Sequence, residues 1–282
     1  MHPVLTQITL FGVSRPIGTY GLCLTAAIGL GSFLMLRAGR RAELDLGAVI
    51  ATLALVVASG FIGTTALFIA VEAVRRGWRW ALFQQIGMVF FGALFAGAAG
   101  LWAGCRLFHL PFGLLADLSV PAVAAAHAIG RLGCFFGGCC YGREWHGPFA
   151  VAFTHPLAPA AYPPIMRHPV QLYESACLLV LALAFALIPP KRMGSGSRFS
   201  SYVAAYCACR IVLETFRADA DRGMVFEGWL TTSQLIGSVY LLIYFGARYG
   251  IKSLDFFRRR PSRLPSRFAC EYIAGDDDRE AR

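Results

Sequence analysis

The sequence predicts an all-α polytopic integral membrane protein with about seven transmembrane helices, an external N-terminus and a cytoplasmic C-terminus. Hydrophobic residues make up 57% of the 282 residues, and the 30 glycines raise the apolar share to about two thirds, against roughly 45–50% in soluble domains. Charged residues reach 15% and separate apolar stretches of about 18–25 residues, each long enough to cross a hydrocarbon core roughly 30 Å thick. The nine cysteines lie mostly in apolar runs, which excludes a disulfide-stapled secreted fold.

The predicted spans lie where the charges stop, at about 17–36, 47–71, 87–105, 112–132, 172–189, 200–216 and 229–247. The second and third contain no charged residue. The fourth and sixth carry or end on ionisable residues, namely Asp117, His127, Arg131, Arg210, Glu214 and Arg217. Because such groups cost at least a few kcal/mol at membrane depth unless they face a partner or a polar cavity, they are candidates for function. The alternative is that they snorkel from helix ends.

The short basic loops predict the orientation. Those after spans one, three, five and seven all fall on one face, which is predicted to be cytoplasmic. One cluster, Arg75, Arg76 and Arg79, disagrees. The net charge of +10 requires no nucleic acid, since basic loops and anionic lipid headgroups account for it. Residues 1–250 are predicted to form one membrane domain, and residues 251–282 a charged, disordered cytoplasmic tail. No removable signal peptide is expected at the N-terminus.

The strongest candidate site lies in residues 126–142. In a helix His127, Arg131 and Cys134 share one face. Gly133 and Gly137, like Gly138 and Gly142, have the small-xxx-small spacing that lets helices approach closely or marks a helix break. A broken helix near the outer surface, with an arginine beside it, suits an anionic headgroup. The alternative is a tight helix-packing seam with a snorkelling arginine.

Three cysteines, Cys134, Cys139 and Cys140, lie in the same segment. We expect no metal there, because a CxxC spacing is missing and adjacent cysteines rarely both bind one zinc ion. A link from Cys134 to Cys139 or Cys140 stays open on the oxidising side of a membrane, and small buried thiols are favoured over it.

Four motifs then follow one another along the chain. They are Tyr20-Gly21-Leu22, residues 133–142 (G-C-F-F-G-G-C-C-Y-G), residues 167–174 (R-H-P-V-Q-L-Y-E), and residues 210–217 (R-I-V-L-E-T-F-R) followed by Asp219. In content and order they resemble the prolipoprotein diacylglyceryl transferase family, in its variant with a G-C-F-x-x-G-C-C-Y-G signature. The resemblance runs from about Tyr20 to Arg248.

The resemblance implies a multi-pass enzyme of the bacterial inner membrane that needs no cofactor. It would move the diacylglyceryl group of phosphatidylglycerol onto the lipobox cysteine of a prolipoprotein signal peptide and release glycerol phosphate, within membrane lipid and without nucleic acid. Arg131 and Arg217 would clamp the phosphate, while Tyr20, Gln171 and Glu174 would orient the headgroup and the arginines. The motif residues His168 and Arg210 are also assigned to substrate binding, although His168 stands before a helix start and equally fits a structural role.

One departure from the family pattern concerns the general base that would take the proton from the substrate thiol. Where the family reads approximately G-M-S-F-H-G-G, residues 87–93 read G-M-V-F-F-G-A, so that Phe91 replaces a histidine. His127, one turn from Arg131, is the predicted replacement; the alternative is a histidine hydrogen-bonded between helices. Two other functions stay open: a catalytically altered or inactive paralogue that binds phospholipid, and a small transporter. The chain shows no repeated halves of the kind that transporters often have.

Overall fold

The computed structural model describes residues 3–10, 13–77, 90–187, 196–218, 224–225 and 229–258. The chain forms two compact units, Met1–Leu241 and Leu242–Arg282. In the second unit the structure describes the end of one helix, on which the Arg248 guanidinium lies over the Tyr244 ring at 5.8 Å.

Seven α-helices lie within the described residues. They are α1 (Thr19–Arg41), α2 (Leu46–Arg76), α3 (Phe90–Leu107), α4 (Phe112–Gly137), α5 (Val170–Leu187), α6 (Ser197–Glu214) and α7 (Thr232–Arg258). Four of them, α1, α2, α4 and α5, are long and apolar enough to cross a membrane, which confirms an integral membrane protein of mainly helical structure. The crossings by α3, α6 and α7 stay predictions, and residues 87–89 of the third predicted span lie outside the described residues.

The all-α prediction missed three small antiparallel ribbons. Strands β1 (Val4–Leu10) and β2 (Val13–Gly18) form a hairpin before α1, β3 (Val151–Ala152) pairs with β4 (Met166–Arg167), and β5 (Met224–Val225) pairs with β6 (Leu230–Thr231). The first helix therefore begins at Thr19, after β2, rather than at residue 17. The β-branched residues of the first hairpin favour this extended conformation.

The predicted disordered tail also needs a correction at its beginning. Helix α7 continues to Arg258, so residues 251–258 are helical. The rest of the tail lies outside the described residues.

Helix α4 is the central element of the first unit. It packs against α1 and α5, while α2 packs against α3 and α5 against α6. Gly133 of α4 makes the close approach to α1 possible, since a Cβ there would lie 2.9 Å from the Cβ of Cys23 and 3.3 Å from the Tyr20 ring. Gly130, one turn earlier, faces open space. The seam predicted from the glycine spacing is therefore real, and it coexists with the polar site described below.

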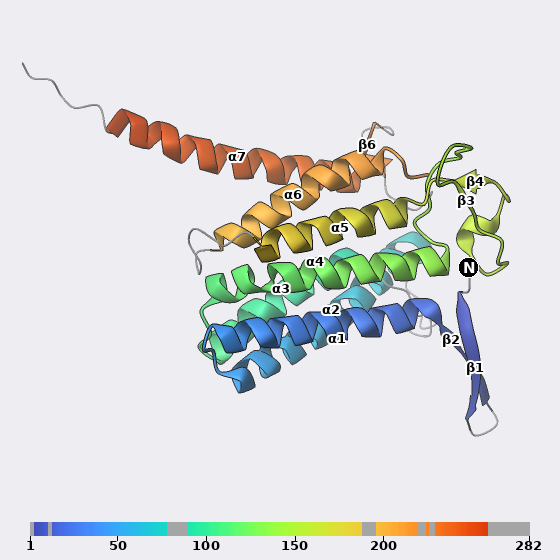
Figure 1. Cartoon of the computed structure of the whole chain (residues 1–282), viewed down its shortest axis with the longest axis horizontal. Helices are drawn as coiled ribbons and strands as arrows, with labels where there is room; N and C mark the ends of the chain where they lie inside the picture. The colour runs from blue at the N-terminus through green and yellow to red at the C-terminus, as the bar shows by residue number, and fades with distance from the viewer. Residues whose placement is uncertain are drawn as a thin grey trace, which may run out of the picture. The chain divides into compact units, whose positions relative to one another are not determined.

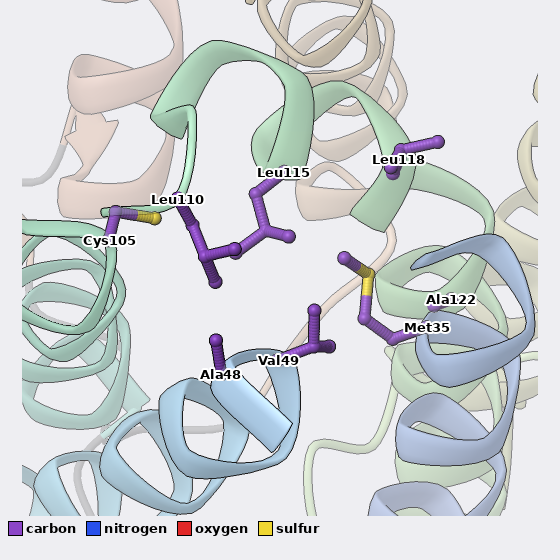
Figure 2. Close-up of a cluster of buried hydrophobic side chains, with 8 residues drawn as sticks. All are labelled: Met35, Ala48, Val49, Cys105, Leu110, Leu115, Leu118 and Ala122. Atoms are coloured by element: carbon purple, nitrogen blue, oxygen red, sulfur yellow. The ribbon is translucent and has the colours of Figure 1, made fainter. Parts of the chain in front are cut away.

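A hydrophobic core joins the ends of the first four helices. Figure 2 shows its members, Met35, Ala48, Val49, Cys105, Leu110, Leu115, Leu118 and Ala122. Beside it lies Asp117, one of the ionisable candidates, which is fully buried. Its carboxylate accepts hydrogen bonds from the backbone N–H groups of Gly196 (3.1 Å) and Phe199 (3.0 Å). Asp117 therefore caps the beginning of α6, where a carboxylate satisfies free backbone donors.

The other end of this unit holds the motif loops. The end of α4, the beginnings of α1 and α5, and the β3–β4 ribbon all lie at the same end of the helices (Figure 1). Helix α4 stops there because Gly138 adopts a left-handed conformation, with φ +70°, and the Cβ of any other residue would collide with Ala158. The helix break predicted in the glycine-rich segment is thus confirmed.

Candidate active site

One buried carboxylate connects three helices. Glu174 of α5 is 2% exposed, and its Oε1 lies 3.0 Å from Nη2 of Arg131 on α4. The Tyr206 hydroxyl of α6 donates to the same oxygen at 2.8 Å, and Nη1 of Arg210, also on α6, donates to Oε2 at 3.2 Å. A buried carboxylate is stable when it is paired and hydrogen-bonded in this way. Its partners therefore fix the relative positions of α4, α5 and α6 at this level.

The ion pairs continue toward the end of α6. Nη2 of Arg210 lies 2.7 Å from Oε2 of Glu214, and Nη1 of Arg217 lies 3.9 Å from the same oxygen. Among the described residues, three arginines (Arg131, Arg210 and Arg217) thus face two carboxylates (Glu174 and Glu214), an excess of one positive charge in this part of the site. The Nε of Arg131 is buried and has no hydrogen-bond partner within the described ranges. The cluster is therefore positive and still has a donor for an anionic ligand.

His127 belongs to the same cluster. Its Nε2 lies 4.0 Å from Oε1 of Glu174, and its ring meets the Tyr206 ring edge-on at 5.2 Å between centroids. The shared face predicted for His127 and Arg131 is confirmed, because both side chains reach Glu174. Phe91, which stands where the resemblance leads us to expect a histidine, stacks on Phe95 with 6.3 Å between ring centroids.

Gln171 links this cluster to the glycine- and cysteine-rich loop. It lies one turn before Glu174, and its Nε2 donates to the backbone carbonyl of Cys139 at 2.6 Å. Its buried Oε1 finds no partner among the residues that the structure describes. The same loop reaches the fourth motif, since the backbones of Gly142 and Arg217 form a β-bridge. The second, third and fourth motifs therefore meet at one end of the helices.

Two predicted site residues lie differently. Tyr20 of α1 is 36% exposed, and it lies within electrostatic range of Arg131 and of the three loop cysteines. His168 is outside the Glu174 cluster: its ring stacks on Trp145 at 4.6 Å and meets Tyr173 and Phe216 edge-on. The backbone carbonyl of His168 accepts a hydrogen bond from the backbone N–H of Gly142 at 3.1 Å. His168 thus holds the loop together, and the partners found for its ring among the described residues are Trp145, Tyr173 and Phe216 rather than an arginine of the cluster.

Tyr206 is the site residue that the sequence analysis missed. It precedes Arg210 by four residues, as Arg210 precedes Glu214, and this spacing places all three on one face of a helix. The signal was available in the sequence. A tyrosine in an apolar span is nevertheless ordinary, and its contact with Glu174 distinguishes it from Tyr202, the other tyrosine of α6.

These features define a class of protein: a helical membrane protein whose buried, net positive cluster of arginines and carboxylates suits an anionic lipid headgroup. The model of the prolipoprotein diacylglyceryl transferase family matches residues 4–249, and the chain belongs to that family.

Three relatives show the extent of the similarity. A phosphatidylglycerol–prolipoprotein diacylglyceryl transferase of Clostridium tetani is 31% identical over 246 residues, which cover 86% of this chain and 95% of the relative. A protein of Clostridium perfringens named phosphatidylglycerol–prolipoprotein diacylglyceryl transferase 2 is 33% identical over 264 residues, 90% of this chain and 96% of the relative. A phosphatidylglycerol–prolipoprotein diacylglyceryl transferase of Dehalococcoides mccartyi is 29% identical over 231 residues, which cover 79% of this chain and 85% of the relative. The similarity covers nearly the whole length of these relatives.

Proposed function

We propose that the protein transfers the diacylglyceryl group of phosphatidylglycerol to the lipobox cysteine thiol of a prolipoprotein, forming a thioether and releasing glycerol phosphate. Relatives that carry this activity in their names align along most of the chain. The observation that carries the proposal is the chain of ion pairs from Arg131 through Glu174, Arg210 and Glu214 to Arg217. It joins residues of the third and fourth motifs to Arg131, which lies two residues before the second motif, in one positive site.

The reaction needs cations at the departing phosphate. When the carbon–oxygen bond of the glycerol breaks, negative charge develops on the phosphate, and donors aimed at that charge stabilise the transition state. We assign this role to Arg131 and Arg217, with Arg210 between them. Glu174 is the positioning residue that holds Arg131 and Arg210, while Gln171 and Tyr20 orient the headgroup near the loop.

The thiol proton needs an acceptor. His127 is the imidazole that lies in the cluster, and we keep it as the proposed base. A neutral imidazole accepts a proton readily near pH 7. Replacement of the family's histidine by Phe91 favours one second candidate function, a paralogue that binds phospholipid without transferring its diacylglyceryl group.

The site requires an external position to meet exported prolipoproteins. We propose a multi-pass protein of the bacterial inner membrane with the motif loops outside and the C-terminus in the cytoplasm, following the basic loops. A phosphatase that folds only outside the cytoplasm should be active when inserted near Trp145 and inactive when fused after Arg248. The reverse pattern would place the motif loops on the cytoplasmic side and invert the topology.

The decisive test of activity combines cells and purified protein. In a strain depleted of its own transferase, expression of this chain should restore growth, and mass spectrometry should find diacylglyceryl-modified lipoproteins. Purified protein should then transfer the group from phosphatidylglycerol to a lipobox peptide. Phosphatidylglycerol binding without thioether formation in either assay would favour the altered paralogue.

A further inference from the structure

Three cysteine sulfurs gather beside the arginine cluster. The Sγ atoms of Cys134, Cys139 and Cys140 all lie within 4.8 Å of one another. The left-handed turn at Gly138 folds the chain back after α4, so that the Cys139 N–H donates to the Cys134 carbonyl at 3.2 Å. Cys140 follows with φ +57°, a conformation that is unfavourable for a residue with a Cβ. The fold thus brings together three thiols at a spacing from which the sequence predicted no metal site.

We propose that these three cysteines bind a zinc ion as thiolates and leave its fourth coordination position open for the thiol of the substrate. The distances suit this ion. With Zn–S bonds of about 2.3 Å in a tetrahedral site, neighbouring sulfurs lie roughly 3.8 Å apart, so the sulfurs need to move together by no more than about 1 Å. Soft thiolates select zinc over magnesium or calcium.

The surroundings support a thiolate site. Three thiolates and one Zn²⁺ carry a net charge of −1, and Cys140 lies within electrostatic range of the cationic Arg131 and Arg217. The Gln171 amide donates to the Cys139 carbonyl at 2.6 Å and holds the backbone of one ligand. Such outer contacts orient metal ligands and tune the metal. The zinc–thiolate group, with its charge of −1, would in turn be an anionic partner for Arg131 and Arg217.

The proposed role rests on the proposed function. Three protein ligands and one open position are the pattern of catalytic rather than structural zinc sites. A thiol that coordinates zinc loses its proton, which here would pass to His127, the base proposed above. The bound sulfur then attacks the glycerol carbon, the new carbon–sulfur bond replaces the carbon–oxygen bond to the phosphate, and glycerol phosphate leaves with the electron pair. The metal would thus supply a thiolate in a chain that has Phe91 where a histidine is usual.

The test uses the full-length protein purified in detergent. We expect about one zinc ion per chain by elemental analysis. Cobalt substitution should give intense thiolate-to-metal charge-transfer absorption. Cys134→Ser, Cys139→Ser and Cys140→Ser should each weaken zinc binding by at least about tenfold, as expected when a ligand is lost. Cys207→Ser is the matched control: Cys207 lies on α6 beside Gly237 of α7 and does not belong to the three-cysteine group, so this variant should retain the metal.

The outcomes separate this proposal from the transferase function. Chelation should stop thioether formation by the wild-type protein, and added zinc should restore it. Transfer by metal-free protein at the wild-type rate would overturn the zinc role while leaving the transferase intact. Zinc binding without transfer would support the site but overturn the function on which its catalytic role rests. A disulfide from Cys134 to Cys139 or Cys140 in protein alkylated at lysis would overturn the metal site itself.

Discussion

Glu174→Gln removes the charge from the centre of the site while preserving its shape. The carboxylate has three partners within 3.2 Å, two of them arginines on different helices. An amide offers one acceptor oxygen and one NH2 group that only donates, so at least one arginine then faces a donor instead of an acceptor. Breaking one side of a buried ion pair costs about 3–5 kcal/mol. The variant should therefore unfold at a clearly lower temperature in detergent.

The same variant should lose activity. Arg131 has Glu174 as its carboxylate partner, and misplacement of such a group by about 1 Å costs roughly 100-fold in rate, or about 2.7 kcal/mol. We expect kcat/KM for transfer from phosphatidylglycerol to a lipobox peptide to fall by about that factor. Glu144→Gln is the matched control, because Glu144 is 56% exposed and pairs with His146 on the surface, where such pairs contribute about 0–1 kcal/mol. A Glu174→Gln enzyme within about threefold of the wild type would refute a positioning role.

Three other changes test the site and its packing. Arg131→Ala or Arg217→Ala should remove about 2–4 kcal/mol of transition-state stabilisation and slow transfer accordingly. Arg131→Lys should restore little of this rate, because an ammonium lacks the bidentate fork of a guanidinium. Full complementation by either alanine variant would exclude that arginine from the phosphate site. Gly133→Ala should lower the free energy of unfolding by about 1–3 kcal/mol, because the new Cβ would lie 2.9 Å from a carbon of α1. Gly130→Ala is the control, since a Cβ at this position meets open space. Equal melting temperatures for the two variants would contradict the close packing of α4 on α1. His127→Asn should lose thioether formation while retaining phosphatidylglycerol binding, measured with labelled lipid. If transfer persists, His127 is not the base, and zinc coordination becomes the source of the thiolate.

The sequence by itself determined the environment and much of the site. Apolar stretches long enough to span a bilayer require a membrane protein, because their burial in lipid is favourable only when the backbone is hydrogen-bonded internally, as in a helix. It also singled out His127, Arg131 and Arg210, since ionisable groups in apolar helices need partners, whereas Glu174 was indicated by the resemblance to the family motif. The short strands before α1 escaped notice because a few residues of extended chain carry little periodic signal.

Tertiary structure decided which ionisable groups act together. Asp117 and Arg131 lie on the same helix and are equally unusual at membrane depth, yet Asp117 caps α6 whereas Arg131 pairs with Glu174. Likewise, Cys134 meets Cys139 and Cys140 because a left-handed turn reverses the chain after α4, and the close contact of Gly138 with Ala158, twenty residues later, holds that turn in place. Helical periodicity specifies the face on which a residue lies. The partner that this face meets depends on how separate helices pack, and that is decided by contacts between residues far apart in the sequence.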